Sequence, residues 1–253
     1  MSDPQMPPDD ATDTRRMKAA FLTVAAVLFA TVPFVVPFDG FEPTNFPVPQ
    51  DDPPVQPAGY AFSIWGPIYL WLLVHALYGL VKRSDMALWD APRWPLTGSL
   101  VIGAAWLPVA QTAPLPATAM IWAMLALALL ALLRTPAEAE RWLLRAPVAL
   151  YAGWLTAASW VALALAGAGY GVGQAAGLGE TGWAWIGLSG ALVTALAVTR
   201  LVQAVPLYTL GVVWALVGVA VANWGVDWGL VVAALGGAAV VAAPEGGGLR
   251  LRR

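Results

Sequence analysis

Residues able to do acid–base, metal or nucleophilic chemistry are scarce in this chain. It has no cysteine and a single histidine, His75, which lies within an apolar stretch. Such a histidine serves a haem, a proton relay, or simply a hydrogen bond to a neighbouring helix. No acidic residue lies inside any apolar stretch, so no paired general acid and base is visible. We therefore expect neither an enzyme nor a metal site.

Tryptophan is the residue type that stands out, with 14 copies. Half of them lie in loops or at the ends of apolar stretches, where indole suits the membrane interface. The others lie deeper, where each indole N–H needs a hydrogen-bond partner. The deep set is Trp65, Trp71, Trp106, Trp122, Trp154, Trp160 and Trp214. Counted at 1.5 Å per residue, four of these fall about 9–12 Å below the same membrane face. The predicted aromatic layer is Trp65, Trp106, Trp122 and Trp160.

Composition and length indicate what positions these rings. Of 253 residues, 59% are apolar and only 11% are charged, which is typical of an integral membrane protein. Stretches without charge that are long enough to cross a bilayer number eight. They are, with approximate ends, 18–36, 59–81, 96–112, 115–134, 146–168, 182–200, 204–223 and 227–243. We predict an all-α protein with about eight transmembrane helices.

The charges give an independent test of that count. All 13 basic residues fall in alternate connections, and the opposite connections carry only acidic residues. By the positive-inside rule, both termini are cytoplasmic. Arginine outnumbers lysine among many alanines and glycines, so we expect a multi-pass protein of a bacterial inner membrane. Its surroundings are the lipid bilayer, and no basic stripe suggests nucleic acid.

The segments outside the spans differ in character. Residues 1–17 are predicted to be a disordered cytoplasmic N-terminus and 244–253 a basic cytoplasmic tail. The connection 37–57 contains seven prolines and is stiff. Beside a membrane bundle such a loop is either a lid or a plain surface connection.

Three prolines within the apolar stretches, Pro33, Pro67 and Pro108, lie in the same half as the predicted aromatic layer. Each is expected to bend its helix, so that the helices splay at one end. Splayed helices lined with rings predict a concave apolar pocket beneath the proline-rich loop. The alternative is that the rings fill the bundle or face lipid.

Four short motifs occur in the order found in one known family. Gly66-Pro67 lies between aromatic residues in WGPIYLWLLVHALYG (65–79), and Trp106 precedes Pro108 by two residues. Trp122 lies in MIWAMLALALL, and Trp154 lies in LYAGWLTAASWVAL (150–163), after Pro147. These motifs resemble spans two to five of the TspO/translocator-protein family, the tryptophan-rich sensory proteins. The resemblance covers about 18–168, and 169–243 would add three helices, as in a longer eight-span branch.

The resemblance implies a five-helix bundle that binds planar hydrophobic ligands such as tetrapyrroles, under a first loop that closes over the pocket. By this resemblance and the depth argument, the expected ligand-binding residues are Trp65, Tyr69, Trp106, Trp122, Trp154 and Ala158. Tyr69 stands where the family usually has tryptophan. The family's Leu-Asn pair is replaced by Val161 and Ala162, and no sterol-type motif follows, so sterol is disfavoured.

Three functions remain open at this point. The first is a non-enzymatic binding protein, sensor or carrier for a tetrapyrrole or similar planar molecule, with a bound porphyrin or other pigment as the possible cofactor. The second is an assembly subunit of a larger, pigment-containing membrane complex or a homo-oligomer, docked through the small-residue faces of the last three spans. A secondary transporter is disfavoured, because Gln111, Asn223 and His75 are few polar residues for an ion or substrate path.

Overall fold

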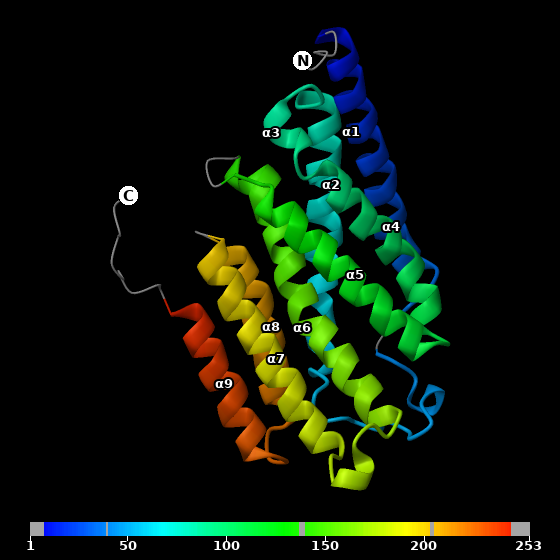
Figure 1. Cartoon of the computed structure of the whole chain (residues 1–253), viewed down its shortest axis with the longest axis vertical. Helices are drawn as coiled ribbons and strands as arrows, with labels where there is room; N and C mark the ends of the chain where they lie inside the picture. Colours follow the sequence, from blue (N-terminus) through cyan, green and yellow to red (C-terminus); the bar gives the residue numbers. More distant parts are fainter. Residues whose placement is uncertain (1–7, 39, 137–139, 203–204, 244–253) are drawn as a thin grey trace, which may run out of the picture.

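The computed structural model describes residues 8–38, 40–136, 140–202 and 205–243. Over these residues the chain is helical and has no β-strand, so the all-α prediction is confirmed for them. Successive long helices run up and down through one bundle (Figure 1). They are α1 (Pro8–Thr31), α2 (Trp65–Lys82), α4 (Arg93–Ala110), α5 (Pro114–Leu133), α6 (Ala146–Gly169), α7 (Glu180–Leu201), α8 (Pro206–Ala222) and α9 (Trp228–Ala242).

The helix starts follow local chemistry. Pro114 and Pro206 begin α5 and α8, where the proline ring is compatible with the first turn and no N–H bond is lost. At the start of α9, the Asp227 carboxylate accepts a hydrogen bond from the Leu230 N–H at 3.1 Å.

The predicted disorder of residues 1–17 is wrong for residues 8–17, because α1 already begins at Pro8. A proline followed by acidic residues favours the first helical turn. Here Pro8 precedes Asp10. Residues 1–7 and the predicted tail 244–253 lie outside the described residues.

Only one of the three expected proline bends lies within a helix. Pro108 lies inside α4, two residues before its end at Ala110. Pro33 lies in a short 3₁₀ turn, Val32–Phe34, directly after α1. Pro67 is the third residue of α2, after a 3₁₀ segment at Gly59–Ile64. Pro33 and Pro67 therefore lie at helix ends and not within a helix as expected, and prolines at helix ends need not interrupt the hydrogen-bond ladder.

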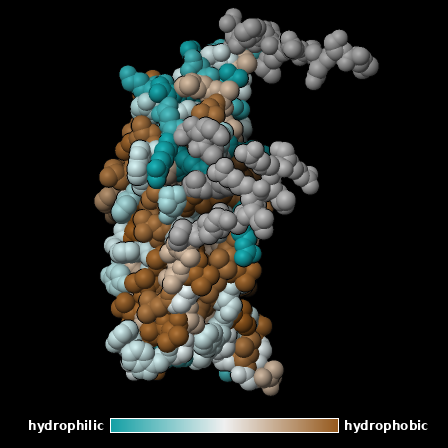
Figure 2. All heavy atoms as spheres, turned by 90° about the vertical axis from the view of Figure 1, so that its left-hand side faces the viewer, coloured by the Kyte–Doolittle hydropathy of each residue, from teal (hydrophilic) through white to brown (hydrophobic). Residues whose placement is uncertain are grey.

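The chain is a multi-pass membrane protein by the length and apolarity of its helices. Among the described residues, five helical segments are long and apolar enough to cross a bilayer, and they contain α1, α2, α5, α6 and α7. Helices α8 and α9 are apolar but shorter, with 17 and 15 residues. Figure 2 shows apolar residues over the middle and lower part of one face, with hydrophilic residues gathered at the end near the N-terminus.

Helix α6 is the central helix of the bundle and packs against α2, α5, α7 and α8. Its contact with α8 depends on Gly153 and Gly211. A Cβ atom added at Gly153 would lie 2.1 Å from the Tyr208 carbonyl oxygen, and one at Gly211 would lie 2.7 Å from the Trp154 nitrogen. The two backbones thus approach as closely as small residues allow, which is how helices associate in lipid.

The small-residue faces of the last three spans are used inside the chain. Gly211 contacts α6. A Cβ at Gly187 of α7 would lie 3.0 Å from Cβ of Ala164, which also belongs to α6. Gly237 faces Leu192 of α7, where an added Cβ would lie 2.6 Å from Leu192 Cδ2. Gly236 alone of these four glycines has nothing within 4 Å. The expectation that these faces dock an assembly partner is therefore wrong for Gly187, Gly211 and Gly237.

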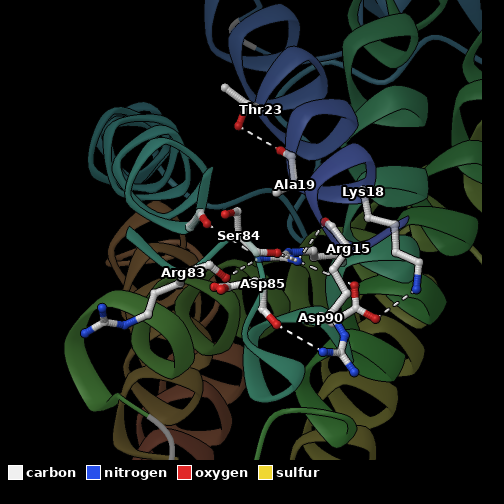
Figure 3. Close-up of polar contacts among 10 residues, drawn as sticks. Arg15, Lys18, Ala19, Thr23, Arg83, Ser84, Asp85 and Asp90 are labelled. Carbon is white, nitrogen blue, oxygen red and sulfur yellow. Dashed lines mark hydrogen bonds and ion pairs between the residues drawn. The ribbon is translucent and has the colours of Figure 1, made fainter. Parts of the chain in front are cut away.

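A polar cluster closes the end of the bundle at which α1 begins. Arg93, at the start of α4, is 1% exposed, and its guanidinium donates to backbone carbonyls at 2.8–2.9 Å. The acceptors are the carbonyl oxygens of Arg15, Arg83 and Ser84. In Figure 3, Lys18 of α1 points toward Asp90 of the short helix α3 (Ala87–Asp90), and Nζ lies 2.8 Å from Oδ2. This cluster joins α1 and α4 to the connection after α2.

His75 has a structural role in the described residues. Its ring stacks on Trp89 with centroids 5.2 Å apart, and Nδ1 lies 2.7 Å from the Leu143 carbonyl oxygen. Leu143 belongs to the π-helical turn Arg141–Arg145 that precedes α6. Of the alternatives raised by the sequence, the hydrogen bond to a neighbouring segment is the one observed.

Candidate functional site

An apolar cavity lies between α2, α4, α5, α6 and α8, at the end of the bundle opposite the polar cluster. Its volume is about 40 Å³. Trp65 of α2, Trp106 of α4 and Trp154 of α6 contribute indole rings to its wall, and Ala158 of α6 and Ala215 of α8 contribute methyl groups. The rings come from three helices, so the cavity is a product of the tertiary fold.

The proline-rich loop forms one side of the cavity. Phe38 and Phe41 both lie in its wall and flank Trp106, with ring centroids 4.8 and 6.2 Å from the Trp106 ring. Between them Gly40 has a φ of +130°, a backbone conformation that favours glycine. The loop therefore covers the cavity, as a lid would, instead of running over the surface.

Hydrogen bonds at its two ends hold the loop to the helices. Near the first end, Gln111 of the α4 terminus donates through Nε2 to the Pro37 carbonyl oxygen. In return, Asn45 Nδ2 donates to the Gln111 carbonyl oxygen at 2.7 Å. At the other end, Asn223 Nδ2 after α8 donates to the Pro54 carbonyl oxygen at 2.8 Å. Two of the polar residues noted in the sequence thus anchor the loop.

The rings of the wall contact one another edge to face. Trp65 lies 6.0 Å from Trp154, and Phe62 lies 6.1 Å from Trp154, both with nearly perpendicular ring planes. The Trp106 indole N–H donates to the Ala117 carbonyl oxygen at 2.9 Å. Trp154 differs, because its Nε1 is buried and has no hydrogen-bond partner among the described residues. A buried donor without an acceptor is unfavourable and would be satisfied by an acceptor atom on a ligand.

A second hollow adjoins the cavity on the side of α1. It has a volume of about 300 Å³ and shares Phe38, Phe62 and Trp65 with the cavity wall. These three rings therefore separate the two spaces. Movement of the rings would join the cavity to the larger hollow.

The predicted ligand-binding residues divide into three groups. Trp65, Trp106, Trp154 and Ala158 line the cavity. Tyr69 lines only the adjoining hollow and stacks on Trp65, with ring centroids 5.3 Å apart. Trp122 lines neither space.

Trp122 lies instead against Trp160, with ring centroids 5.1 Å apart. The Trp160 N–H donates to Thr194 Oγ1 of α7 at 3.0 Å. The predicted single layer of four tryptophans is therefore two separate groups, because Trp122 and Trp160 lie on sides of their helices that face away from the cavity.

Several lining residues were not anticipated from the sequence. Phe38 and Phe41 belong to the loop, and Phe62 precedes α2. For Phe38 and Phe41, the available signal was aromatic character inside a stiff loop next to the predicted pocket. For Ala215 of α8 the sequence offers no signal, because alanine is common in every span.

A family model described as TSPO-like protein matches residues 18–244. The match includes α7, α8 and α9, so it extends well beyond the 18–168 expected from the motifs. No curated protein and no solved structure matches the chain.

Proposed function

The chain belongs to the TSPO-like protein family, and from this premise we propose that it binds a planar apolar molecule, such as a tetrapyrrole, without turning it over. The observation that carries the proposal is the convergence of aromatic rings from the loop, α2, α4 and α6 on one apolar cavity. Flat rings pack well against aromatic side chains in offset and edge-to-face arrangements. Among the residues that the structure describes, none in the cavity wall carries an acid or base side chain.

The cavity is smaller than such a ligand requires. Small-molecule pockets usually have volumes of roughly 300–1,000 Å³. The cavity has about 40 Å³, whereas the adjoining hollow has about 300 Å³. We infer that ligand entry requires the loop and the rings of Phe38, Phe62 and Trp65 to move, so that the two spaces become one.

Orientation and location form part of the proposal. The basic residues of the described chain lie at the end of the bundle that carries Arg15, Arg93 and their neighbours. By the positive-inside rule this end faces the cytoplasm, and the cavity with its loop faces the opposite side. We propose eight spans in a bacterial inner membrane with both termini in the cytoplasm.

Porphyrin binding tests the proposal. The full chain in lipid nanodiscs is titrated with protoporphyrin IX, and Kd is taken from the concentration dependence of fluorescence quenching. Replacement of Trp106 by phenylalanine removes indole contacts in the cavity and should raise Kd about fivefold, since aromatic contacts contribute on the order of 1 kcal/mol.

Trp122 supplies the matched control, because it is a tryptophan of similar depth that lies outside the cavity wall. Trp122→Phe should leave Kd within twofold of that of the unmodified chain. The proposal fails if quenching does not saturate, or if the Trp122 and Trp106 variants change Kd to the same extent.

A further inference from the structure

An outer hollow lies between the proline-rich loop and the connection from α8 to α9. Its volume is about 410 Å³, and its wall includes Asp52 of the loop and Asn223 of the connection. Gln56 and Pro57 line both this outer hollow and the cavity of the candidate site. These two loop residues therefore separate the cavity from a space that is large enough to hold part of a ligand.

Gln56 is a polar residue in a largely apolar wall. Among the described residues that line the cavity, it is the only one with a carboxamide, hydroxyl or charged side chain. Its amide lies against Gly40, where an added Cβ would lie 3.2 Å from Gln56 Oε1 and 3.3 Å from Nε2. A second polar group of the wall is the buried Trp154 N–H, which has no partner among the described residues. Of these two groups, only Gln56 also borders the outer hollow.

The end of the bundle that carries the cavity is acidic. The connections that follow α1, α4, α6 and α8 contain no lysine, arginine or histidine. The ion pairs among the described residues, such as Lys18–Asp90 and Arg83–Glu140, lie at the opposite end. The potential over the outer hollow is therefore negative, since no basic partner neutralises the carboxylates described there. The acidic residues described at this end are Glu42, Asp51, Asp52, Glu180 and Asp227.

We propose that the site selects planar ligands whose polar edge is neutral or positively charged over ligands that carry carboxylates. This inference rests on the proposed function, because the ring must occupy the cavity beside Trp106. The polar edge would then extend past Gln56 into the outer hollow, next to Asp52.

The chemistry of the outer hollow gives the reason for this selectivity. A carbonyl or ester oxygen of the ligand can accept a hydrogen bond from the Gln56 carboxamide. A carboxylate in the same place would lie near acidic side chains such as Asp52. Proteins usually bind carboxylates through arginine or lysine, and this end of the bundle has neither. The water that a carboxylate loses on entry is therefore not replaced by a cation.

Two forms of one macrocycle test this inference. Protoporphyrin IX carries two propionates, and its dimethyl ester has the same ring without their charges. The full chain in lipid nanodiscs should bind both forms, measured by fluorescence quenching at about 10 mM salt, where screening is weak. The quantity compared between variants is the ratio of the Kd of the free acid to the Kd of the ester. Partition of each form into the lipid is the same for every variant, so the change in this ratio reports on the protein.

Two substitutions that keep the shape of the side chain should move this ratio in opposite directions. Asp52→Asn removes a negative charge, and asparagine tolerates the φ of +48° at this position. This variant should lower the ratio about threefold, because repulsion of the propionates is reduced. Gln56→Glu adds a negative charge between the cavity and the outer hollow and should raise the ratio about tenfold.

The control variant is Asp13→Asn, which removes the same charge from an exposed position of α1 at the opposite end of the bundle. It should leave the ratio unchanged, because the distance exceeds the screening length. Retained binding of the dimethyl ester shows that each variant is folded. A ratio that stays constant in both test variants, or that moves against the expected directions, overturns the charge selectivity while ring binding stands. If the unmodified chain binds neither form, the proposed function itself is overturned.

Discussion

Replacing Gln111 by alanine should speed ligand entry by releasing one anchor of the loop. Its Nε2 donates to the carbonyl oxygen of Pro37, the residue before Phe38, and Phe38 separates the cavity from the adjoining hollow. The substitution leaves the Gln111 backbone carbonyl in place, so the hydrogen bond from Asn45 is kept. The perturbation is therefore confined to one donor.

The magnitude follows from the strength of a single hydrogen bond. A typical intramolecular hydrogen bond contributes about 1 kcal/mol net, and this amount changes an equilibrium constant about fivefold. If ligand enters only when the loop is open, the association rate scales with the open fraction. Gln111→Ala should raise that rate about fivefold, and the double variant with Asn45→Ala should raise it roughly 30-fold if the two bonds act independently.

The assay is stopped-flow quenching of tryptophan fluorescence by protoporphyrin IX at several ligand concentrations. The loop closes again over bound ligand in this mechanism, so the dissociation rate should rise with the association rate and Kd should change little. Gln174→Ala is the control, since it makes the same substitution at an exposed glutamine after α6. An unchanged association rate would show that the Gln111 hydrogen bond does not hold the loop closed. A changed Kd at an unchanged association rate would make Gln111 a ligand contact instead.

Three further predictions concern the wall and the packing. Trp154→Phe removes the buried N–H that lacks a partner, so Tm should not fall. Kd should rise more for a porphyrin with a free acceptor at its ring than for a porphyrin whose acceptor is blocked. Fluorescence titration of the variant with both porphyrins measures this difference. Gly153→Ala should destabilise the chain by about 1–3 kcal/mol, because its Cβ would overlap the Tyr208 carbonyl. Gly236→Ala has open space around it and should leave Tm unchanged. Thermal unfolding followed by circular dichroism compares the two variants. Arg93→Lys should lower stability by about 2–3 kcal/mol in the same assay, since an ammonium group cannot reproduce the fork of donors that reaches the surrounding carbonyls. A Tm equal to that of the unmodified chain would contradict the role assigned to this polar cluster.

Part of the fold was predictable from the sequence for a direct physical reason. Backbone polar groups in lipid must be paired within the segment, so long apolar runs become helices almost regardless of their neighbours. The eight apolar stretches coincide with the long helices within a few residues at most ends. The main exception is α1, which extends ten residues further toward the N-terminus than the predicted span at 18, because helix formation also depends on the acidic first turn.

The candidate site was predictable in depth but not in direction. Position along a helix follows from counting residues, which placed Trp65 and Trp106 at the level of the cavity. The side of a helix that faces the cavity is set by rotation about the helix axis, and a helix that is apolar all round gives no pattern from which to read it. Trp122 was therefore assigned to the site although it lies against Trp160.

The tertiary structure alone decided which residues form the cavity wall. Close contact of Gly153 with the Tyr208 backbone fixes how α8 lies on α6, and this contact brings Ala215 into the wall. The folding back of the loop adds Phe38 from a segment that is remote from Trp106 in sequence. Composition and spacing thus determined that helices cross the membrane and how deep their rings lie. Which rings meet depends on backbone contacts between distant segments, and these form only when the whole bundle packs.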